Sequence, residues 1–309
     1  MKPLQLDDRG LREVAFYEMI HEAVHHKKNT SVCMDDDDDD ASSIEYQQGR
    51  YSLKVPIPTQ GIEQTFELLC ALKPFVPDYF GVVEHHSTLF FDRFTSHSKV
   101  VLSDIAAPFQ HPCMLDLKMG RKTYEPDASQ DKKERQRRKY PQQETFGFRI
   151  VGMKVYDPDH EASDPSSGYR MFEKGFGRQL KRREDVSSAL QTFFKVKGSG
   201  ASASATECTS RGMDSSSSIL DRIEMVLQIL ELIQSLRQVM EECNNDITFF
   251  VTSTLIAYEG DDNAFSPDRF TLKLIDFAHV RYCAGGDPGF NHGLDTIMTF
   301  LEAIVRQRD

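Results

Sequence analysis

Residues 111–120, His-Pro-Cys-Met-Leu-Asp-Leu-Lys-Met-Gly, place two opposite charges in an otherwise apolar segment. The run from Cys113 to Met119 predicts a short buried strand that follows a proline and ends before a glycine. Because side chains alternate along a strand, Asp116 and Lys118 share one face. A carboxylate and an ammonium on a buried strand are costly unless they are paired or used. The segment alone fits either a structural ion pair or a functional site.

Composition is that of a globular protein. Of the 309 residues, 39% are hydrophobic and 10% are aromatic, which is enough to bury the core of one large domain or two lobes. The net charge is −11, but Asp35 to Asp40 supply six of the negative charges, so overall acidity says little about partners. No apolar run approaches the roughly 20 residues of a membrane span, and no signal-peptide pattern opens the chain. The six cysteines lack CxxC spacing, which favours reduced thiols in an intracellular protein.

Hydrophobic periodicity predicts both helices and strands. Helices are expected at about residues 9–26, 62–72, 183–194, 219–240 and 295–305. Strands are expected at about residues 88–91, 99–103, 113–119, 146–156, 247–258 and 269–277. Two low-complexity segments, residues 29–60 with the aspartate run and residues 198–218 rich in Ser, Ala and Gly, are expected to be flexible inserts.

A basic segment, residues 132–139, carries six cations among eight residues. If it is helical, one face holds Lys132, Arg135, Gln136 and Lys139. Such a face suits a ligand with several phosphates, because each cation can make a charge-assisted hydrogen bond. The segment also fits a nuclear-import signal or a solvated helix, and by itself it leaves these three alternatives open.

The first expected helix contains His21-Glu-Ala-Val-His25, which matches the HExxH pattern of zinc peptidases. In that reading both histidines would hold the metal and Glu22 would be the general base. Against it, Ala23 and Val24 belong to the expected core stripe of the helix, and no third ligand follows at a familiar spacing. Ordinary polar helix positions are the competing interpretation.

Three motifs occur together in a recognisable order. Pro112-x-x-x-Asp116-x-Lys118-x-Gly120 comes first, Ser253-Thr-Leu-Ile-Ala-Tyr-Glu-Gly260 follows, and Leu274-Ile-Asp-Phe-Ala-His279 is third. In this order they resemble the signatures of the inositol polyphosphate kinase family, and the resemblance extends over residues 2–305 outside the two inserts.

The resemblance implies an α+β fold of the protein-kinase-like two-lobe type. Residues 1–104 would form the N-terminal lobe, and residues 105–309 the C-terminal catalytic lobe with an inositol-binding segment at 121–194. Relatives carry further strands before the residue that matches Lys2. We therefore expect an incomplete, truncated N-terminal lobe in this chain.

The resemblance also assigns nucleotide-binding roles. Lys2 would reach the ATP phosphates, and Glu13 would orient it through an ion pair. Asp276 would hold the magnesium ion that bridges those phosphates, and Asp116 would bind the ribose hydroxyls. Asp104 lies at the expected hinge, where relatives contact the adenine, although Ser103 stands where they often have glutamate.

On the acceptor side, the resemblance makes Lys118 a catalytic residue that bridges the transferring phosphate and the inositol hydroxyl. Ser253 lies at the family's serine position near the site, and His279 would contact the acceptor or its phosphate. The basic segment takes the place of the family's inositol-binding helix. This position favours substrate binding by its predicted face, Lys132, Arg135, Gln136 and Lys139.

These assignments imply an ATP- and Mg²⁺-dependent kinase that transfers the γ-phosphate to a hydroxyl of a phosphorylated inositol. Residues 122–129 and Lys139-Tyr-Pro141 look most like the multikinases, which implies inositol tris- and tetrakisphosphates as substrates. Hexakisphosphate kinase and trisphosphate 3-kinase are alternatives within the family. A non-catalytic phosphoinositide-binding scaffold and a zinc peptidase are alternatives of other classes. We expect a monomer in the nucleus or cytoplasm that binds no nucleic acid, with phosphoinositide headgroups as further candidate ligands.

Overall fold

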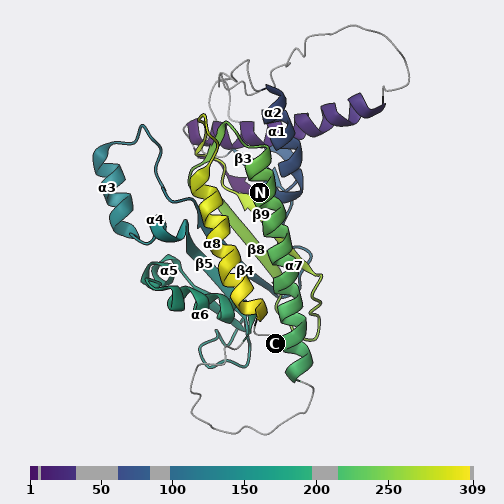
Figure 1. Ribbon diagram of the computed structural model, residues 1–309. Helices are drawn as coiled ribbons and strands as arrows, with labels where there is room; N and C mark the ends of the chain where they lie inside the picture. Colours follow the sequence, from purple (N-terminus) through teal and green to yellow (C-terminus); the bar gives the residue numbers. More distant parts are fainter. Residues whose placement is uncertain (6–7, 33–61, 84–97, 197–214, 307–309) are drawn as a thin grey trace. The chain divides into compact units, whose positions relative to one another are not determined.

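The computed structural model describes residues 1–5, 8–32, 62–83, 98–196 and 215–306 (Figure 1). These residues belong to two compact units. The first comprises residues 1–104, 238–252 and 273–288, and the second comprises residues 105–237, 253–272 and 289–309. Within the described ranges, no helix is long and apolar enough to cross a membrane.

The first unit contains a three-stranded antiparallel sheet in the order β1-β3-β2. Its strands are β1 (Lys2–Pro3), β2 (Tyr79–Val83) and β3 (Lys99–Leu102). The helices of this unit are α1 (Asp8–Val32), α2 (Ile62–Leu72) and the 3-10 helix η1 (Lys73–Phe75). A second antiparallel pair comes from later in the chain and joins β7 (Ile247–Phe249) to β10 (Val280–Tyr282).

The core of the first unit forms around α1, because its apolar residues recur at helical spacing. Phe16 and Tyr17 are each 1% exposed. Their rings contact Phe277 at centroid distances of 4.4 and 5.1 Å, and Phe16 also meets Phe249 at 5.7 Å. These aromatic contacts join α1 to the last residue of β7 and to the segment before β10, both far away in the sequence.

The second unit contains the five-stranded sheet β6-β5-β4-β8-β9. Its strands are β4 (Pro112–Met119), β5 (Phe148–Tyr156), β6 (Tyr169–Phe172), β8 (Ser253–Glu259) and β9 (Phe270–Ile275), the last of which continues into the first unit. β4 is central and pairs antiparallel with both β5 and β8. Along β4 every second residue from Cys113 to Met119 is fully buried, while Asp116 and Lys118 are half-buried on the other face. The predicted strand and its shared charged face are therefore confirmed.

Helices surround this sheet: α3 (Gln130–Lys139), α4 (Gln143–Phe146), α5 (Lys174–Gln179), α6 (Arg183–Phe194), α7 (Ser215–Glu242) and α8 (Pro288–Val305). In Figure 1, α7 and α8 run side by side across one face of the sheet, and Arg237 Nε donates to Asp295 between them at 2.8 Å. On α8, Phe300 meets the ring of Phe148 at a centroid distance of 6.2 Å. This face carries the apolar residues of β4, which leaves Asp116 and Lys118 on the opposite face.

Three predicted helices have different bounds in the structure. The helix expected at 9–26 continues to Val32, because no glycine or proline interrupts residues 27–32. The helix expected at 219–240 begins at Ser215 and ends at Glu242, and the helix expected at 295–305 begins at Pro288. The predicted strand 88–91 and most of both inserts, residues 33–60 and 198–214, lie outside the described residues.

The long strand expected at 247–258 is wrong, because the chain turns between β7 and β8. Val251 adopts a positive φ of 62° there, a conformation that a β-branched residue rarely takes. The strand expected from Phe146 begins at Phe148 instead, since Gly147 ends α4 with a φ of 70°. A Cβ on Gly147 would lie 2.6 Å from the backbone nitrogen of Gly293, so this turn requires glycine.

Candidate active site

A charged cluster in the first unit joins three residues from distant parts of the sequence. Lys2 Nζ donates to Glu13 Oε1 at 2.6 Å and also forms an ion pair with Asp276. The side chain of Glu13 is 1% exposed, whereas those of Lys2 and Asp276 are 38% and 42% exposed. The carboxylate on α1 is thus fixed inside the unit, while the ammonium and the second carboxylate reach solvent.

The backbone explains how Asp276 reaches this position. It follows β9 with a positive φ of 68°, so the chain turns sharply there. Thr252 is fully buried, and its hydroxyl donates to the carbonyl oxygen of Asp276 at 3.5 Å. The turn after β7 therefore supports the turn after β9.

Burial and charge act against each other in this cluster. Burial raises the pKa of Glu13 and outweighs the opposing effect of Lys2. For Lys2, burial lowers the pKa, but Asp276 and Glu13 together raise it above its usual value. Lys2 therefore stays an ammonium ion at neutral pH. One Glu13 oxygen, Oε2, is buried without a hydrogen-bond partner among the described residues, which is typical of a site that holds a charge in place at the expense of stability.

In the second unit, the sheet register places the predicted strand residues beside new neighbours. Lys118 lies opposite Ser253 on β8 and opposite Arg149 on β5. Ser253 is 1% exposed, and within the described part of the chain its hydroxyl has no hydrogen-bond partner. Since directly paired residues share a face, Lys118, Ser253 and Arg149 project to the same side as Asp116.

The basic segment is a helix, as predicted. Ser129 caps α3, and its hydroxyl accepts the backbone N–H of Lys132 at 3.3 Å. Lys133 donates to the carbonyl oxygen of Pro126 at 2.7 Å, and the guanidinium of Arg137 lies 5.3 Å from the ring centre of Tyr124. The side chains of Lys133 and Arg137 therefore contact the segment that precedes α3.

Only part of the α3 face that was predicted to bind substrate lines a hollow. A shallow hollow of roughly 540 Å³ is lined by Asp131, Glu134, Arg135, Arg138 and Lys139. Lys132 and Gln136 are half-buried and do not line it. The hollow contains two carboxylates, and one of them, on Glu134, is paired with Arg138 at 3.1 Å. Arg135 and Lys139 are thus the predicted residues that the hollow exposes together.

The remaining predicted positions lie in the first unit. Asp104 is exposed directly after β3, and His279 is half-buried just before β10. Ser103 takes part in local structure: its backbone N–H donates to the carbonyl of Asp78 at 2.9 Å, and its hydroxyl accepts the N–H of Asp78 at 2.8 Å. Ser103 therefore has a structural role, because its two hydrogen bonds with Asp78 join the end of β3 to the residue before β2.

The zinc hypothesis gains no third ligand. His21 and His25 do face one another, with their Nε2 atoms 3.2 Å apart, on an exposed part of α1. Among the residues that the structure describes, no group of three His, Cys, Asp or Glu side chains is arranged to hold a metal ion. The described residues therefore give the peptidase interpretation no three-residue metal site.

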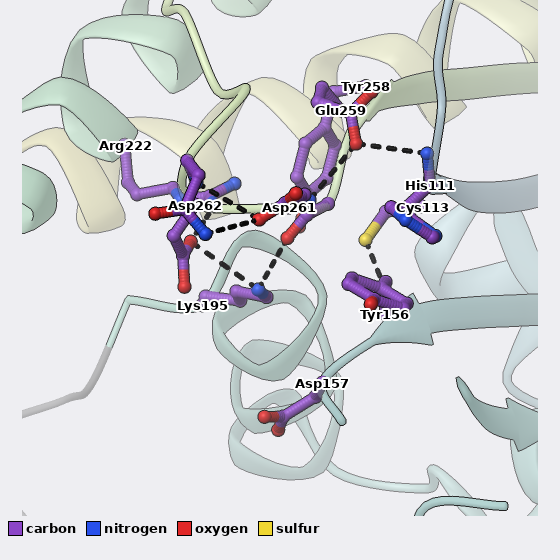
Figure 2. Close-up of polar contacts among 12 residues, drawn as sticks. His111, Cys113, Tyr156, Asp157, Lys195, Arg222, Tyr258, Glu259, Asp261 and Asp262 are labelled. Carbon is purple, nitrogen blue, oxygen red and sulfur yellow. Dashed lines mark hydrogen bonds and ion pairs between the residues drawn. The ribbon is translucent and has the colours of Figure 1, made fainter. Parts of the chain in front are cut away.

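Sequence reasoning gave Glu259 no role, yet its carboxylate holds the segment that leads into β4 (Figure 2). Glu259 is fully buried, and its two oxygens accept the backbone N–H groups of Gln110, His111 and Asp261 at 2.7, 3.0 and 3.0 Å. Gly260 donates to the carbonyl of His111 at 2.8 Å, and a Cβ on Gly260 would lie 2.7 Å from that oxygen. The only sequence signal was the Tyr-Glu-Gly motif itself.

Beside it, Figure 2 shows Lys195 and Arg222 converging on the segment after β8. Lys195 ends α6 with a φ of 55° and donates to the carbonyl of Gly260 at 2.7 Å. Arg222 is 3% exposed, forms an ion pair with Asp262, and lies over the ring of Phe265 at 3.7 Å. Lys195 and Arg222 therefore hold the segment that follows β8 in place.

The fold is that of a kinase-like α+β protein. It matches the crystal structure of the inositol phosphate multikinase Ipk2 from S. cerevisiae, solved in complex with ADP and Mn²⁺, with a TM-score of 0.58. The match covers 76% of this chain and 90% of the yeast chain at 22% sequence identity. Residues 99–302 match the family model described as inositol polyphosphate kinase, and the chain belongs to this family.

Curated relatives agree with this assignment. Over 276 residues the chain is 26% identical to human inositol polyphosphate multikinase, a match that covers 89% of this chain and 47% of the relative. It is 26% identical to human inositol hexakisphosphate kinase 3, covering 67% of this chain and 52% of the relative. It is 30% identical to inositol polyphosphate multikinase alpha of Arabidopsis thaliana, covering 75% and 77%. The chain spans about half the length of the two human relatives.

Proposed function

We propose that this protein is an ATP-dependent inositol polyphosphate kinase of the multikinase type. The observation that carries the proposal is the cluster of Lys2, Glu13 and Asp276, which the fold assembles from three distant segments. A buried glutamate that orients a lysine, next to a carboxylate that reaches solvent, is the arrangement that phosphoryl transfer requires. Membership of the family supports the same conclusion.

The cluster is chemically suited to a nucleotide triphosphate with its metal ion. Asp276 offers a half-exposed carboxylate, and carboxylate oxygens are ligands that Mg²⁺ prefers. Lys2 offers an ammonium ion that can bind phosphate oxygens in the same place. When bound, Mg²⁺–ATP supplies the phosphoryl group and a divalent charge that offsets the negative charge of the transferring oxygens. Glu13 holds Lys2 in position, and its burial prevents it from competing for the metal.

Other residues complete the proposed site. Asp116 binds the ribose hydroxyls, and the hinge at Asp104 receives the adenine. Lys118 bridges the transferring phosphate and the attacking hydroxyl, with Ser253 beside it in register. Arg135 and Lys139 of α3, with Lys132 and Gln136 on its neighbouring face, bind the phosphates of the acceptor, and His279 contacts the acceptor or its phosphate. Residues 1–104 act as the N-terminal lobe, and residues 105–309 supply the acceptor site.

The proposed acceptor is an inositol tris- or tetrakisphosphate, because several cations project from α3 and β5 within one unit. A phosphoinositide headgroup presents the same phosphates and is a further candidate. The enzyme is proposed to act as a monomer inside the cell, in the nucleus or cytoplasm, without a nucleic acid partner.

The test is incubation of the purified protein with labelled ATP, Mg²⁺ and a panel of inositol phosphates and phosphoinositide headgroups. We expect transfer of label to at least one inositol phosphate. Asp276→Asn should remove nearly all turnover, since the side chain keeps its size but loses its charge, and Lys118→Ala should lower kcat more than ATP affinity. Asp159→Asn, at an exposed turn, is the matched control. Binding of inositol phosphates without any turnover would favour the non-catalytic scaffold.

A further inference from the structure

Two histidines on α1 face each other, and the proposed kinase chemistry does not use them. The Nε2 atoms of His21 and His25 lie 3.2 Å apart, and the two ring centres are 4.4 Å apart. As it stands, this contact is a hydrogen bond in which one ring donates its Nε2–H to the bare Nε2 of the other. The two rings therefore bring together the atoms with which imidazoles bind a metal ion.

The backbone of α1 holds both rings on one outward face. Residues four positions apart are neighbours on a helix surface, so a single helix brings the two imidazoles together. Ile20 and Ala23 lie on the opposite side of the same turns and are 2% and 4% exposed, which fixes the rotation of the helix against the core of the first unit. His21 and His25 are both exposed, so an ion from solvent can reach them.

The distance between the two nitrogens fits one metal ion. Zinc binds imidazole nitrogens at about 2.0–2.1 Å, so two such ligands at a tetrahedral angle lie about 3.3–3.4 Å apart. The Nε2 atoms of His21 and His25, at 3.2 Å, are already close to this separation. The proton of the donor ring moves to its Nδ1 through solvent, and each Nε2 then offers a lone pair to the same ion.

The ring of His21 is kept ready for a metal. Burial, then His25 and Lys73, lower the pKa of His21, so this imidazole is neutral at neutral pH. The ammonium of Lys73 by itself would repel a cation. It is paired with the carboxylate of Asp78, however, with Nζ and Oδ1 2.6 Å apart, and this pairing offsets its charge.

Two carboxylates add negative charge to the same helix surface. Glu18 precedes His21 by three positions, and Glu22 precedes His25 by three, so the four side chains are neighbours. Burial raises the pKa of Glu18, the hydroxyl of Tyr79 opposes this by donating to it at 3.0 Å, and the charge of Glu22 raises it further. A divalent ion on the histidines would relieve the repulsion between the two carboxylates.

We propose that His21 and His25 bind one divalent transition-metal ion such as Zn²⁺, and that water completes its coordination. Imidazole nitrogen suits Zn²⁺, Cu²⁺ and Ni²⁺, whereas Mg²⁺ prefers oxygen ligands and does not compete for this site. With two protein ligands in place of the four of a structural zinc site, the ion exchanges with solvent, and dialysed protein carries none. The site thus differs from a peptidase centre, which holds zinc with three protein ligands.

Such an ion would link two successive turns of α1. The fully buried Glu13 lies on the same helix, about 12 Å before His21 along the helix axis. Metal binding would therefore stabilise the helix that carries Glu13 without contacting the cluster that Glu13 forms with Lys2. Because the ion binds only the folded helix in this way, added metal should raise the melting temperature.

The test is calorimetric titration of ZnCl₂ into protein that has been dialysed against EDTA and then against metal-free buffer, with excess Mg²⁺ added. It compares wild type with His21→Ala, His25→Ala and the double variant. His26→Ala is the matched control, because it removes a histidine that lies about 100° around the same helix from His25. The melting temperature of each protein is recorded with and without Zn²⁺.

We expect wild type to bind one Zn²⁺ at this pair with a dissociation constant of roughly 1–100 µM, since half of the ligands of a structural zinc site are present. Each single substitution should raise this constant at least about tenfold, and the double variant should add little, because a lone imidazole cannot chelate. Zn²⁺ should raise the melting temperature of wild type and His26→Ala more than that of the other variants.

Three results would overturn the proposal, and none of them depends on kinase activity. The first is equal zinc affinity in wild type, His21→Ala and His25→Ala. The second is a wild type that binds no Zn²⁺ below about 1 mM. The third is zinc that survives the dialysis against EDTA, because retention requires further protein ligands. Since both histidines are exposed, all variants should melt as wild type does without Zn²⁺; a lower melting temperature with unchanged zinc affinity would make the pair structural.

Discussion

Replacing Glu259 with glutamine tests how much its carboxylate stabilises the segment that leads into β4. The buried carboxylate accepts three backbone N–H groups, and hydrogen bonds to a charged group are worth about 1.5–3 kcal/mol each. A glutamine oxygen in place of Oε1 can keep the bonds from His111 and Asp261 in weaker, neutral form. Its NH₂ group then opposes the N–H of Gln110, which is left unpaired. We expect the free energy of unfolding to fall by about 2–4 kcal/mol.

The pH dependence gives an independent measure of the same contacts. Burial would raise the pKa of Glu259, but the N–H groups of Asp261, Gln110 and His111 outweigh it, so the pKa lies below its usual value of 4.5. The unfolded chain therefore takes up this proton at a higher pH than the folded chain. The stabilisation is present above about pH 4.5 and is lost as pH falls through the lower folded pKa. Glu259→Gln should lack this part of the acid dependence.

The assay is thermal unfolding followed by circular dichroism between pH 3 and 8, with Glu161→Gln at an exposed turn as the control. At pH 7 the apparent melting temperature of Glu259→Gln should be lower by roughly 5–10 °C. The difference from wild type should shrink as the pH falls below 4.5. A variant as stable as wild type at pH 7, or a difference that does not change with pH, would refute the stabilising role of the Glu259 carboxylate.

Two further predictions concern helices α3 and α1. Neutralising Lys132 and Arg135 together should raise the KM for an inositol phosphate at least about tenfold and reduce the dependence of this KM on salt, as measured by steady-state kinetics. Neutralising Lys133 and Arg137, which contact Pro126 and Tyr124, is the control and should leave the KM unchanged. Equal effects of both pairs would make α3 a solvated helix. His21→Ala should leave kinase activity intact and elemental analysis should find no stoichiometric zinc in the wild type, whereas zinc that is lost with this substitution would restore the peptidase interpretation.

The local sequence pattern was sufficient to predict a strand or helix whose own residues show which face is buried. The alternation from Cys113 to Met119 predicts the buried strand and the shared face of Asp116 and Lys118, because burial on one face is visible in the sequence. The same holds for α2 and α6, whose bounds were predicted to the residue. The signature motifs led to the family because they combine residues whose spacing is fixed by chemistry.

Non-local contacts were beyond such reasoning. The break between β7 and β8 falls inside a continuous run of apolar and small residues, where neither period nor composition changes. Glu259 is a single carboxylate at the end of a buried strand. What makes it important is the pair of N–H groups of Gln110 and His111, which lie about 150 residues earlier in the sequence. A side chain whose partners are backbone atoms of another segment leaves no trace in its own sequence neighbourhood.

Arg149 shows how much one residue of register can change. Strict alternation along residues 148–156 would put Arg149 on the same face as Val151, Met153 and Val155, the apolar side of the sheet. The pairing with β4 shifts by one residue between Asp116 and Leu117, and the bulge turns Arg149 to the face of Lys118. Without the bulge, Lys118 would lie opposite Ile150, and the guanidinium would point into the core. The bulge therefore places the charge of Arg149 beside Lys118 instead of in the core.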